Sequence, residues 1–395
     1  MTLADRSLDI APLPAVIFGA GSISRLGDVV KAHGSRAVVV TDAGVLGAGV
    51  AAQVMDVLAA AGVPAVLFAD VHANPILEDV LGAHAVLAAV GPVPGAVVVG
   101  LGGGSAMDTA KAVALLATNP GGLDLAAVRA LDYRNELPNP ALPLVCVPTT
   151  SGTGAETNGF GVLTDHELNN KLYPGNASCL PRVALLDAAL TVGVPKGATA
   201  NTGMDALTHA IEAMSSKYRH EYADGICLQV AHLVRAWLPT AVADGSNLEA
   251  RAQLQMASHL AGVAMATGTG QGACHGIGHA LSTRLGVAHG AGLAVMLPHI
   301  MRFNLPTCTG AYARLALALG VGRVGAADDS NAAAAIEAVE ALSAQVGTAK
   351  RLADFGLTDA LVDVIAADCL ADVVTRSASR EPSLEEARAL VAAAL

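Results

Sequence analysis

The first half of the chain repeats one pattern, in which short apolar runs rich in β-branched residues alternate with longer stretches rich in Ala and Leu. The runs are Ala15–Phe18, Ala37–Val40, Ala65–Phe68, Ala96–Val99 and Leu144–Val147. Runs that are apolar at every position predict strands covered on both faces, and strands separated by helices pair in parallel. The pattern therefore predicts an α/β domain with a parallel sheet, whose ligands bind beyond the carboxyl ends of the strands.

A glycine-rich turn follows the fourth run and leads into a helical stretch. The segment from Gly100 to Asp108, Gly-Leu-Gly-Gly-Gly-Ser-Ala-Met-Asp, leaves bare backbone amides at the start of a helix. Such amides form an anion site together with the helix dipole, and glycine lets the chain approach a pyrophosphate closely. We expect Ser105 to add a hydroxyl donor. Asp108 suits the dipole but not a phosphate, so it is either an N-terminal helix charge or a contact on the ribose or substrate side.

A second turn of this kind follows the fifth run, where Thr149, Thr150 and Thr153 offer hydroxyls toward a cofactor. One such loop is usually only a helix cap, but two strand-end loops in one sheet favour a dinucleotide site. Asp42 stands just after the second run, where a carboxylate accepts hydrogen bonds from an adenosine ribose and repels a 2′-phosphate. The position predicts NAD rather than NADP, although an ordinary strand-end Asp would look the same.

Strand signals fade after Pro195, and most of the remaining sequence is helical. We therefore predict a dinucleotide-binding α/β domain over 1–195 and an all-α metal-binding domain over 196–395. In the second domain Asp205 and His209 are four residues apart, so they share one face of a helix. Their neighbours are apolar, and both polar groups would be costly to bury without a partner.

Further along the chain, His275 and His279 are again four residues apart, and His289 comes ten residues later. Neutral imidazoles and a carboxylate suit Fe(II), Zn(II) or similar divalent ions. For one histidine alone a hydrogen-bonded core residue is the better interpretation, but the combined pattern favours a metal site. Cys274 is excluded as a companion ligand of His275, because adjacent residues on a helix diverge by about 100°.

Composition and charge exclude several classes of protein. Hydrophobic residues make up 53% of the chain and aromatics only 3%, which is typical of a compact enzyme and not of a disordered protein. The net charge of −11, without a basic stripe, argues against a nucleic-acid partner. The uncharged stretch 85–107 contains prolines and glycines, and it predicts two short soluble elements rather than a membrane span. With no secretory signal and six scattered cysteines, we expect reduced thiols and a cytoplasmic protein.

Several stretches together resemble the iron-dependent (group III) alcohol dehydrogenase family, over nearly the full length of the chain. They are Asn74-Pro75, Gly102 to Lys111, Pro148 to Glu156, Gly203 to Glu212, and His275 to His289 with Leu297-Pro298-His299. The resemblance implies an N-terminal dinucleotide-binding domain, a C-terminal helical domain, and a cleft between them that holds NAD and a metal. It also implies a homodimer.

The resemblance assigns roles to individual residues of this sequence. The positions that match the family's metal ligands are Asp205, His209, His275 and His289. The positions that match its cofactor contacts are Asp42, Asn74, Gly103, Gly104, Ser105, Asp108, Thr149, Thr153, Val162 and Lys171. His279 matches a histidine near the nicotinamide that is not a ligand. We interpret it as the catalytic residue that relays a proton to solvent, the alternative being a residue that orients a ligand.

Two stretches depart from the family pattern. Met265 to Gln271 is one residue longer than the norm and lacks the usual Phe-Ser-Asn, and Ala378-Ser379-Arg380 stands where Asn-Pro-Arg is frequent. We expect both stretches to shape the substrate pocket, so the resemblance does not specify the alcohol.

The predicted reaction is reversible hydride transfer between a primary alcohol and NAD⁺, with Fe(II) as the expected ion and Zn(II) or Mn(II) as alternatives. Two rival interpretations stay open. A zinc polyol dehydrogenase or dehydroquinate-synthase-like lyase of the same superfamily usually has three protein ligands, and a lyase would also want basic residues near the metal. A non-catalytic metal or nucleotide sensor needs only one of the two sites. Four matched ligands beside an intact nucleotide loop favour the dehydrogenase, with a small alcohol or aldehyde as its partner.

Overall fold

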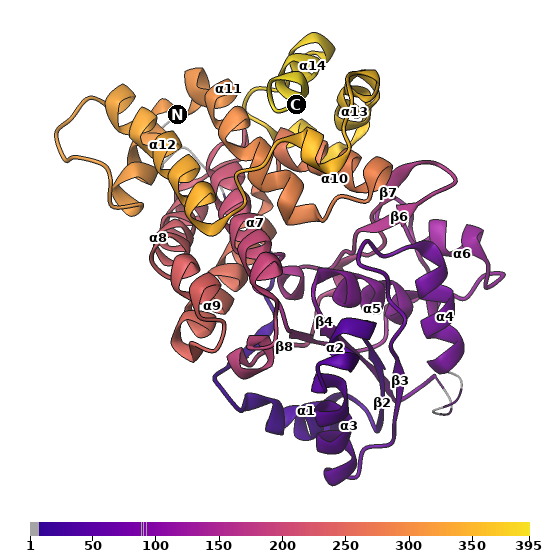
Figure 1. Cartoon of the computed structure of the whole chain (residues 1–395). Helices are drawn as coiled ribbons and strands as arrows, with labels where there is room; N and C mark the ends of the chain where they lie inside the picture. Colours follow the sequence, from indigo (N-terminus) through magenta and orange to yellow (C-terminus); the bar gives the residue numbers. More distant parts are fainter. Residues whose placement is uncertain (1–7, 88, 90, 92) are drawn as a thin grey trace.

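The computed structural model describes residues 8–395 except 88, 90 and 92, and its first half contains a parallel sheet (Figure 1). The six strands lie in the order β1-β8-β5-β4-β2-β3. Their bounds are Ala15–Phe18 (β1), Arg36–Val40 (β2), Ala65–Phe68 (β3), Ala96–Gly102 (β4), Leu144–Pro148 (β5) and Val183–Leu186 (β8). All five predicted runs are strands, and every pairing between them is parallel, so the predicted fold class of the first half is confirmed. β8 was not predicted.

Helices cover both faces of this sheet. They are α1 (Leu26–His33), α2 (Ala43–Gly47), α3 (Val50–Ala60), α4 (Leu77–Leu87), α5 (Gly104–Leu116) and α6 (Leu125–Arg129). Alternate residues of a strand point to opposite faces. Val38 and Val40 of β2 accordingly belong to a core with α4 and α5, whereas Val39 belongs to a second core with α1 and α3. This two-sided burial explains why the strands are apolar at every position.

A short antiparallel hairpin, which the sequence did not predict, follows the fifth strand. It consists of β6 (Leu163–Asp165) and β7 (Asn170–Leu172). Its strands have only three residues each, too few for an alternating pattern to stand out from a loop. The hairpin matters because it carries Lys171 toward the site.

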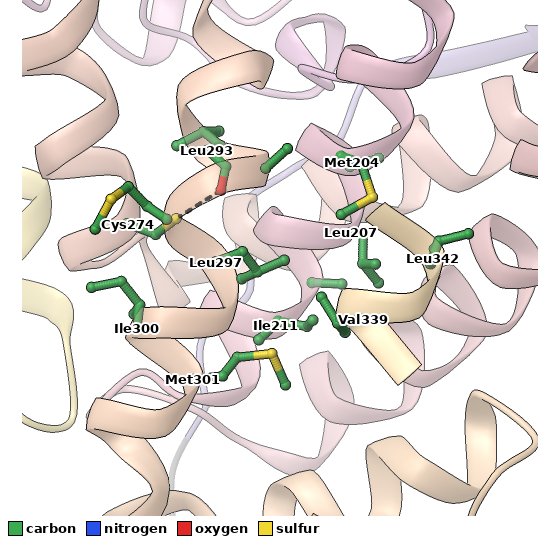
Figure 2. Packing of buried hydrophobic residues seen from close by; sticks show 14 of the residues in the cluster. Met204, Leu207, Ile211, Cys274, Leu293, Leu297, Ile300, Met301, Val339 and Leu342 are labelled. Atoms are coloured by element: carbon green, nitrogen blue, oxygen red, sulfur yellow. Dashed lines mark hydrogen bonds between the residues drawn. The ribbon is translucent and has the colours of Figure 1, made fainter. Parts of the chain in front are cut away.

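Helices are the regular elements of the second half among the described residues, as predicted. Its helices are α7 (Lys196–Met214), α8 (Glu221–Ala243), α9 (Leu248–Ala264), α10 (Ala273–Leu285), α11 (His289–Ala318), α12 (Asp328–Val346), α13 (Asp359–Ala371) and α14 (Leu384–Ala393). Side chains from α7, α11 and α12 interlock in one apolar core (Figure 2). The Cys274 thiol lies in this core and donates to the Leu293 carbonyl, so it is directed away from the neighbouring imidazoles.

One helix among the described residues, α8, is long and apolar enough to cross a membrane by length and composition. It packs between α7 and α9, and Val230, Val234 and Leu238 are fully buried there. We therefore assign it to the core of the helical half. The described residues of the uncharged stretch 85–107 contain the end of α4, strand β4 and the start of α5, three elements where two were predicted.

Candidate metal and nucleotide site

Three helices bring the predicted metal ligands together. α7 carries Asp205 and His209, α10 carries His275, and His289 is the first residue of α11. One ligand atom each of Asp205, His275 and His289 lie within 4.8 Å of one another. The Nε2 atoms of His275 and His289 are 3.8 and 3.9 Å from Asp205 Oδ1, and His209 Nδ1 is 3.5 Å from the same oxygen.

The donor atoms of this cluster fit a divalent metal ion. Asp205 Oδ1 and His275 Nε2 are buried and have no hydrogen-bond partner among the described residues. Unpaired polar atoms in a protein interior cost free energy, and an ion between them would remove that cost. A carboxylate oxygen with imidazole nitrogens is a donor set for first-row divalent ions.

Glu212 on α7 orients His275, although no sequence argument singled it out. Its carboxylate accepts a hydrogen bond from His275 Nδ1, and also accepts the backbone amides of Gly272 at 3.0 Å and Cys274 at 2.7 Å. With Nδ1 donating to Glu212, Nε2 of His275 faces Asp205. Burial alone would lower the pKa of His275, but the two carboxylates raise it to about 9.

The other three predicted ligands have the charge states that metal binding needs. Burial lowers the pKa of His209 to about 4 and that of His289 well below its ordinary value. Burial would raise the pKa of Asp205, but the surrounding histidines hold it below its usual range. Near neutral pH the two imidazoles are therefore neutral and the carboxylate is ionised.

His279 lies one turn after His275 on α10, and its ring stacks on His289 with centroids 5.3 Å apart. Its Nδ1 is 2.7 Å from Asp372 Oδ2, and the Tyr173 hydroxyl donates to Asp372 Oδ1 at 2.6 Å. Burial lowers the pKa of His279, against the opposing effect of Asp372. The sequence interpretation missed both Asp372 and Tyr173.

A cavity of about 750 Å³ joins the imidazoles to the glycine-rich loop. Predicted site residues on its wall are Asn74, Gly104, Ser105, Asp108, Thr153, Val162, Lys171, His209, His279 and His289. The two predicted loops meet here because β4 and β5 are neighbours, with Gly102 opposite Pro148. The described residues that line the cavity do not include the predicted site residues Asp42, Gly103, Thr149, Thr150, Asp205 and His275. Of these, Thr150 packs beside Gly103, where a Cβ would lie 3.2 Å from the Thr150 Oγ1.

Asp42 and Ser105, both predicted to contact the cofactor, have protein partners in this structure. Asp42 caps α2, with Oδ1 accepting the amides of Gly44 and Val45 at 2.8 and 3.0 Å. The Ser105 hydroxyl donates to the Ala73 carbonyl at 2.6 Å. Asp42 thus adopts the ordinary strand-end role that the sequence left open, and its contact with a ribose stays a prediction.

Asp108 anchors the loop that precedes the hairpin. Its carboxylate accepts the Val162 amide at 3.1 Å and the Lys111 ammonium at 3.3 Å. Burial raises the pKa of Asp108, and Lys111 opposes that shift. Lys171 donates to Thr164 Oγ1 at 2.9 Å, and burial lowers the pKa of Lys171 to about 8.

The stretch 265–271 forms part of the cavity wall, as expected. Met265–Thr269 is a π-helical turn, a feature frequent at functional sites, and Gly268 in it has φ 98°. Gln271 then lies with its Nε2 3.3 Å from His209 Nε2. The stretch 378–380 is absent from the described lining, contrary to expectation; Arg380 stacks instead on Phe303, 3.9 Å from the ring centroid.

Comparison with known proteins gives consistent matches over the whole chain. The family model "Iron-containing alcohol dehydrogenase" matches residues 14–188, and "Fe-containing alcohol dehydrogenase family, C-terminal" matches 199–395. The chain is 38% identical over 382 residues to the probable alcohol dehydrogenase EutG of Escherichia coli K12, covering 96% of this chain and 93% of that protein. It is 32% identical over 385 residues to the NAD-dependent methanol dehydrogenase of Bacillus methanolicus, covering 97% and 98%. A solved 1,3-propanediol oxidoreductase superposes with a TM-score of 0.91 at 33% identity, covering 99% of this chain and 100% of that one.

Proposed function

The chain belongs to the iron-containing alcohol dehydrogenase family, and from this premise we propose that it transfers a hydride reversibly between a primary alcohol and NAD⁺ at a site formed by both halves of the chain. It is an NAD(H)-dependent oxidoreductase of alcohols and aldehydes, as its alcohol, lactaldehyde and propanediol dehydrogenase relatives indicate. The observation that carries the finer proposal is that one cavity is lined both by the glycine loop and by the clustered imidazoles.

In this proposal Asp205, His209, His275 and His289 hold a divalent ion, with Fe(II) preferred and Zn(II) or Mn(II) able to use the same ligands. When bound, the ion supplies Lewis acidity toward the substrate oxygen. Two carboxylates arrange the site for this ion. Asp205 offers an ionised oxygen, and Glu212 directs His275 Nε2 toward that oxygen.

The nucleotide binds along the carboxyl ends of β4 and β5. Backbone amides of Gly103 and Gly104, at the N-terminus of α5, receive the pyrophosphate. The other contacts in this proposal are Asn74, Ser105, Asp108, Thr149, Thr150, Thr153, Val162 and Lys171. At the end of β2, Asp42 favours a free ribose 2′-hydroxyl and therefore NAD over NADP.

His279 takes up the proton that the substrate hydroxyl loses and passes it to solvent. Asp372 holds Nδ1 of this ring and Tyr173 holds Asp372, so Nε2 is the nitrogen left for the proton. The hydride leaves the carbinol carbon for the nicotinamide. One alcohol and NAD⁺ therefore give one aldehyde, NADH and a proton.

The rival interpretations fit the cavity less well. A lyase acting on a phosphorylated or carboxylated substrate would need several basic side chains at its site. Among the described residues that line the cavity, Lys171 is the only Lys or Arg. A sensor would need only the metal site or the nucleotide site, whereas this cavity is lined by both.

We also propose that the protein is a cytoplasmic homodimer. All six cysteines are buried free thiols, which suits a reducing compartment. β1 is an edge strand, paired only with β8 in the part of the chain that the structure describes, and its Val16 and Phe18 side chains are 46% and 44% exposed. An exposed apolar edge of this kind favours pairing with another chain.

The test is an NADH-absorbance screen of short alcohols and aldehydes, with protein reconstituted separately with Fe(II), Zn(II) and Mn(II). We expect turnover with at least one ion and its loss in His275→Ala, because that variant lacks a ligand. His232→Ala, on the exposed face of α8, is the matched control and should retain full activity. Undiminished activity in His275→Ala would overturn the mechanism, and no turnover with any substrate or ion would favour the sensor.

A further inference from the structure

Among the four proposed metal ligands, His209 is one whose metal-facing atom, Nε2, already has a hydrogen-bond partner in the described chain. Its Nδ1 lies 3.3 Å from the Gly152 carbonyl oxygen, and its Nε2 lies 3.3 Å from Gln271 Nε2. A carbonyl oxygen only accepts, so Nδ1 carries the proton, and Nε2 accepts an N–H from the amide. In this neutral ring Nε2 is the nitrogen that holds the lone pair, so His209 would bind a metal ion through Nε2. Asp205 Oδ1 and His275 Nε2, by contrast, have no such partner within the described chain.

The backbone around Gln271 is held firmly. The turn before it is anchored by the Ser216 hydroxyl, which donates to the Thr269 carbonyl at 2.5 Å. The amide after it, that of Gly272, donates to Glu212 Oε2 at 3.0 Å. The Gln271 side chain itself lines the cavity, so rotation about its own bonds is enough to move it away from His209.

We propose that Gln271 is a displaceable cap on the metal site. In the metal-free protein its amide satisfies His209 Nε2, and when a divalent ion binds, the amide turns into the cavity and releases that nitrogen. Asp205, His275 and His289, which already lie within 4.8 Å of one another, receive the ion first, and His209 completes the site. The inference rests on the proposed ligand set and adds that Gln271 competes with the ion.

The test compares the full-length, metal-stripped protein with Gln271→Met, which has a similar length but no N–H donor. Dissociation constants for Co(II) and Zn(II) are measured by competition with a chromophoric chelator, without substrate or nucleotide. We expect the variant to bind about fivefold more tightly, because the ion no longer displaces one neutral hydrogen bond. Gln253→Met, on α9, where the amide donates to Glu249, makes the same chemical change away from the site and should bind as wild type does.

Gln271→Asn provides a second variant, since it keeps the amide but shortens it by one methylene. We expect this variant also to bind Co(II) and Zn(II) more tightly than wild type. If Gln271→Met fails to fold, Gln271→Asn serves as the test in its place. If the variants bound the ions as tightly as wild type or less tightly, the proposed cap would be wrong, but the proposed metal site would be unaffected. If wild-type protein bound neither ion, the proposed metal site itself would fall, and the cap with it.

Discussion

Glu212 and Asp372 each engage Nδ1 of a histidine, and so they decide which nitrogen of the ring faces the cavity. Glu212 had a signal in the sequence, because it follows Asp205 by two helical turns on α7 and must share its face. Asp372 had none, since it meets His279 across 93 residues of chain. A carboxylate that orients another side chain is recognised only when its partner is known.

Replacing Glu212 by Gln should weaken binding of Zn(II) or Co(II) by about 10- to 100-fold, the usual cost of losing a carboxylate that orients a metal-bound histidine. The amide keeps the shape but no longer accepts strongly from His275 Nδ1. Chelator competition measures the effect. Glu249→Gln, exposed on α9, is the control, and equal constants for the two variants would contradict the role assigned to Glu212.

Binding of NADH should weaken as the pH rises through about 8, because burial lowers the pKa of Lys171 to about 8 and the ammonium loses its charge there. The cofactor is anionic, so the protonated amine favours it. We expect roughly a fivefold higher Kd at pH 9 than at pH 7, on the scale of one screened charge interaction. Fluorescence titration of Lys171→Met should show weak binding without this slope; a slope as steep as wild type would exclude Lys171 as its source.

Among elements, one close contact between the two halves is that of a strand-end loop with α9. Gly154 precedes a short 3-10 helix, Ala155–Thr157, and its backbone lies directly against Gly262. A Cβ on Gly262 would lie 2.6 Å from the Gly154 carbonyl oxygen and 2.8 Å from its Cα. The nucleotide loop is thereby seated on the helix that leads into the π-helical turn.

Gly262→Ala should therefore destabilise the protein by about 1–3 kcal/mol, the usual cost of overpacking a filled interior. Gly225→Ala on α8 is a matched control, because a Cβ there meets nothing within 4 Å. In that helix the alanine should be neutral or stabilising by up to about 1 kcal/mol. Urea unfolding of both variants measures the difference in their free energies of unfolding. Equal values would show that the backbone at this contact shifts to accept the added methyl group at no cost.

At the scale of the whole molecule, the cavity exists because the helical half packs on the carboxyl edge of the sheet. The Gly152 carbonyl from the first half orients His209 in the second, and the Tyr173 hydroxyl from the first half holds Asp372 in the second. The sheet is not covered in this way at β1, which forms an edge of the sheet with exposed apolar side chains.

Phe18→Asp should convert the proposed homodimer into monomers, because a charge on the exposed edge strand opposes pairing with a second copy. Sedimentation velocity gives the mass of each species. Val324→Asp is the control, since Val324 is 94% exposed in the helical half and belongs to no strand. A dimer that persists in Phe18→Asp would place the interface elsewhere.

The sequence by itself determined the parallel sheet, the helical second half and the residues at the strand ends. These follow from local rules: a strand buried on both faces must be apolar at every position, and residues four apart on a helix share a face. The pairs Asp205 with His209 and His275 with His279 are therefore recognisable from their spacing alone. β6 and β7 are not, because runs of three residues carry too little periodicity, whereas β8 is a four-residue apolar run like those predicted and was missed.

Only the tertiary structure decided which polar groups meet. Asp205, His275 and His289 converge because α7, α10 and α11 pack together, and Gln271 lies beside His209 just after the π-helical turn Met265–Thr269. Hydrogen bonds between distant segments depend on distances of a few tenths of an ångström, and no local pattern encodes these. The proposed set of metal ligands thus rests on spacing and family resemblance, whereas the contacts of its side chains with Glu212, Gly152 and Gln271 are a property of the fold.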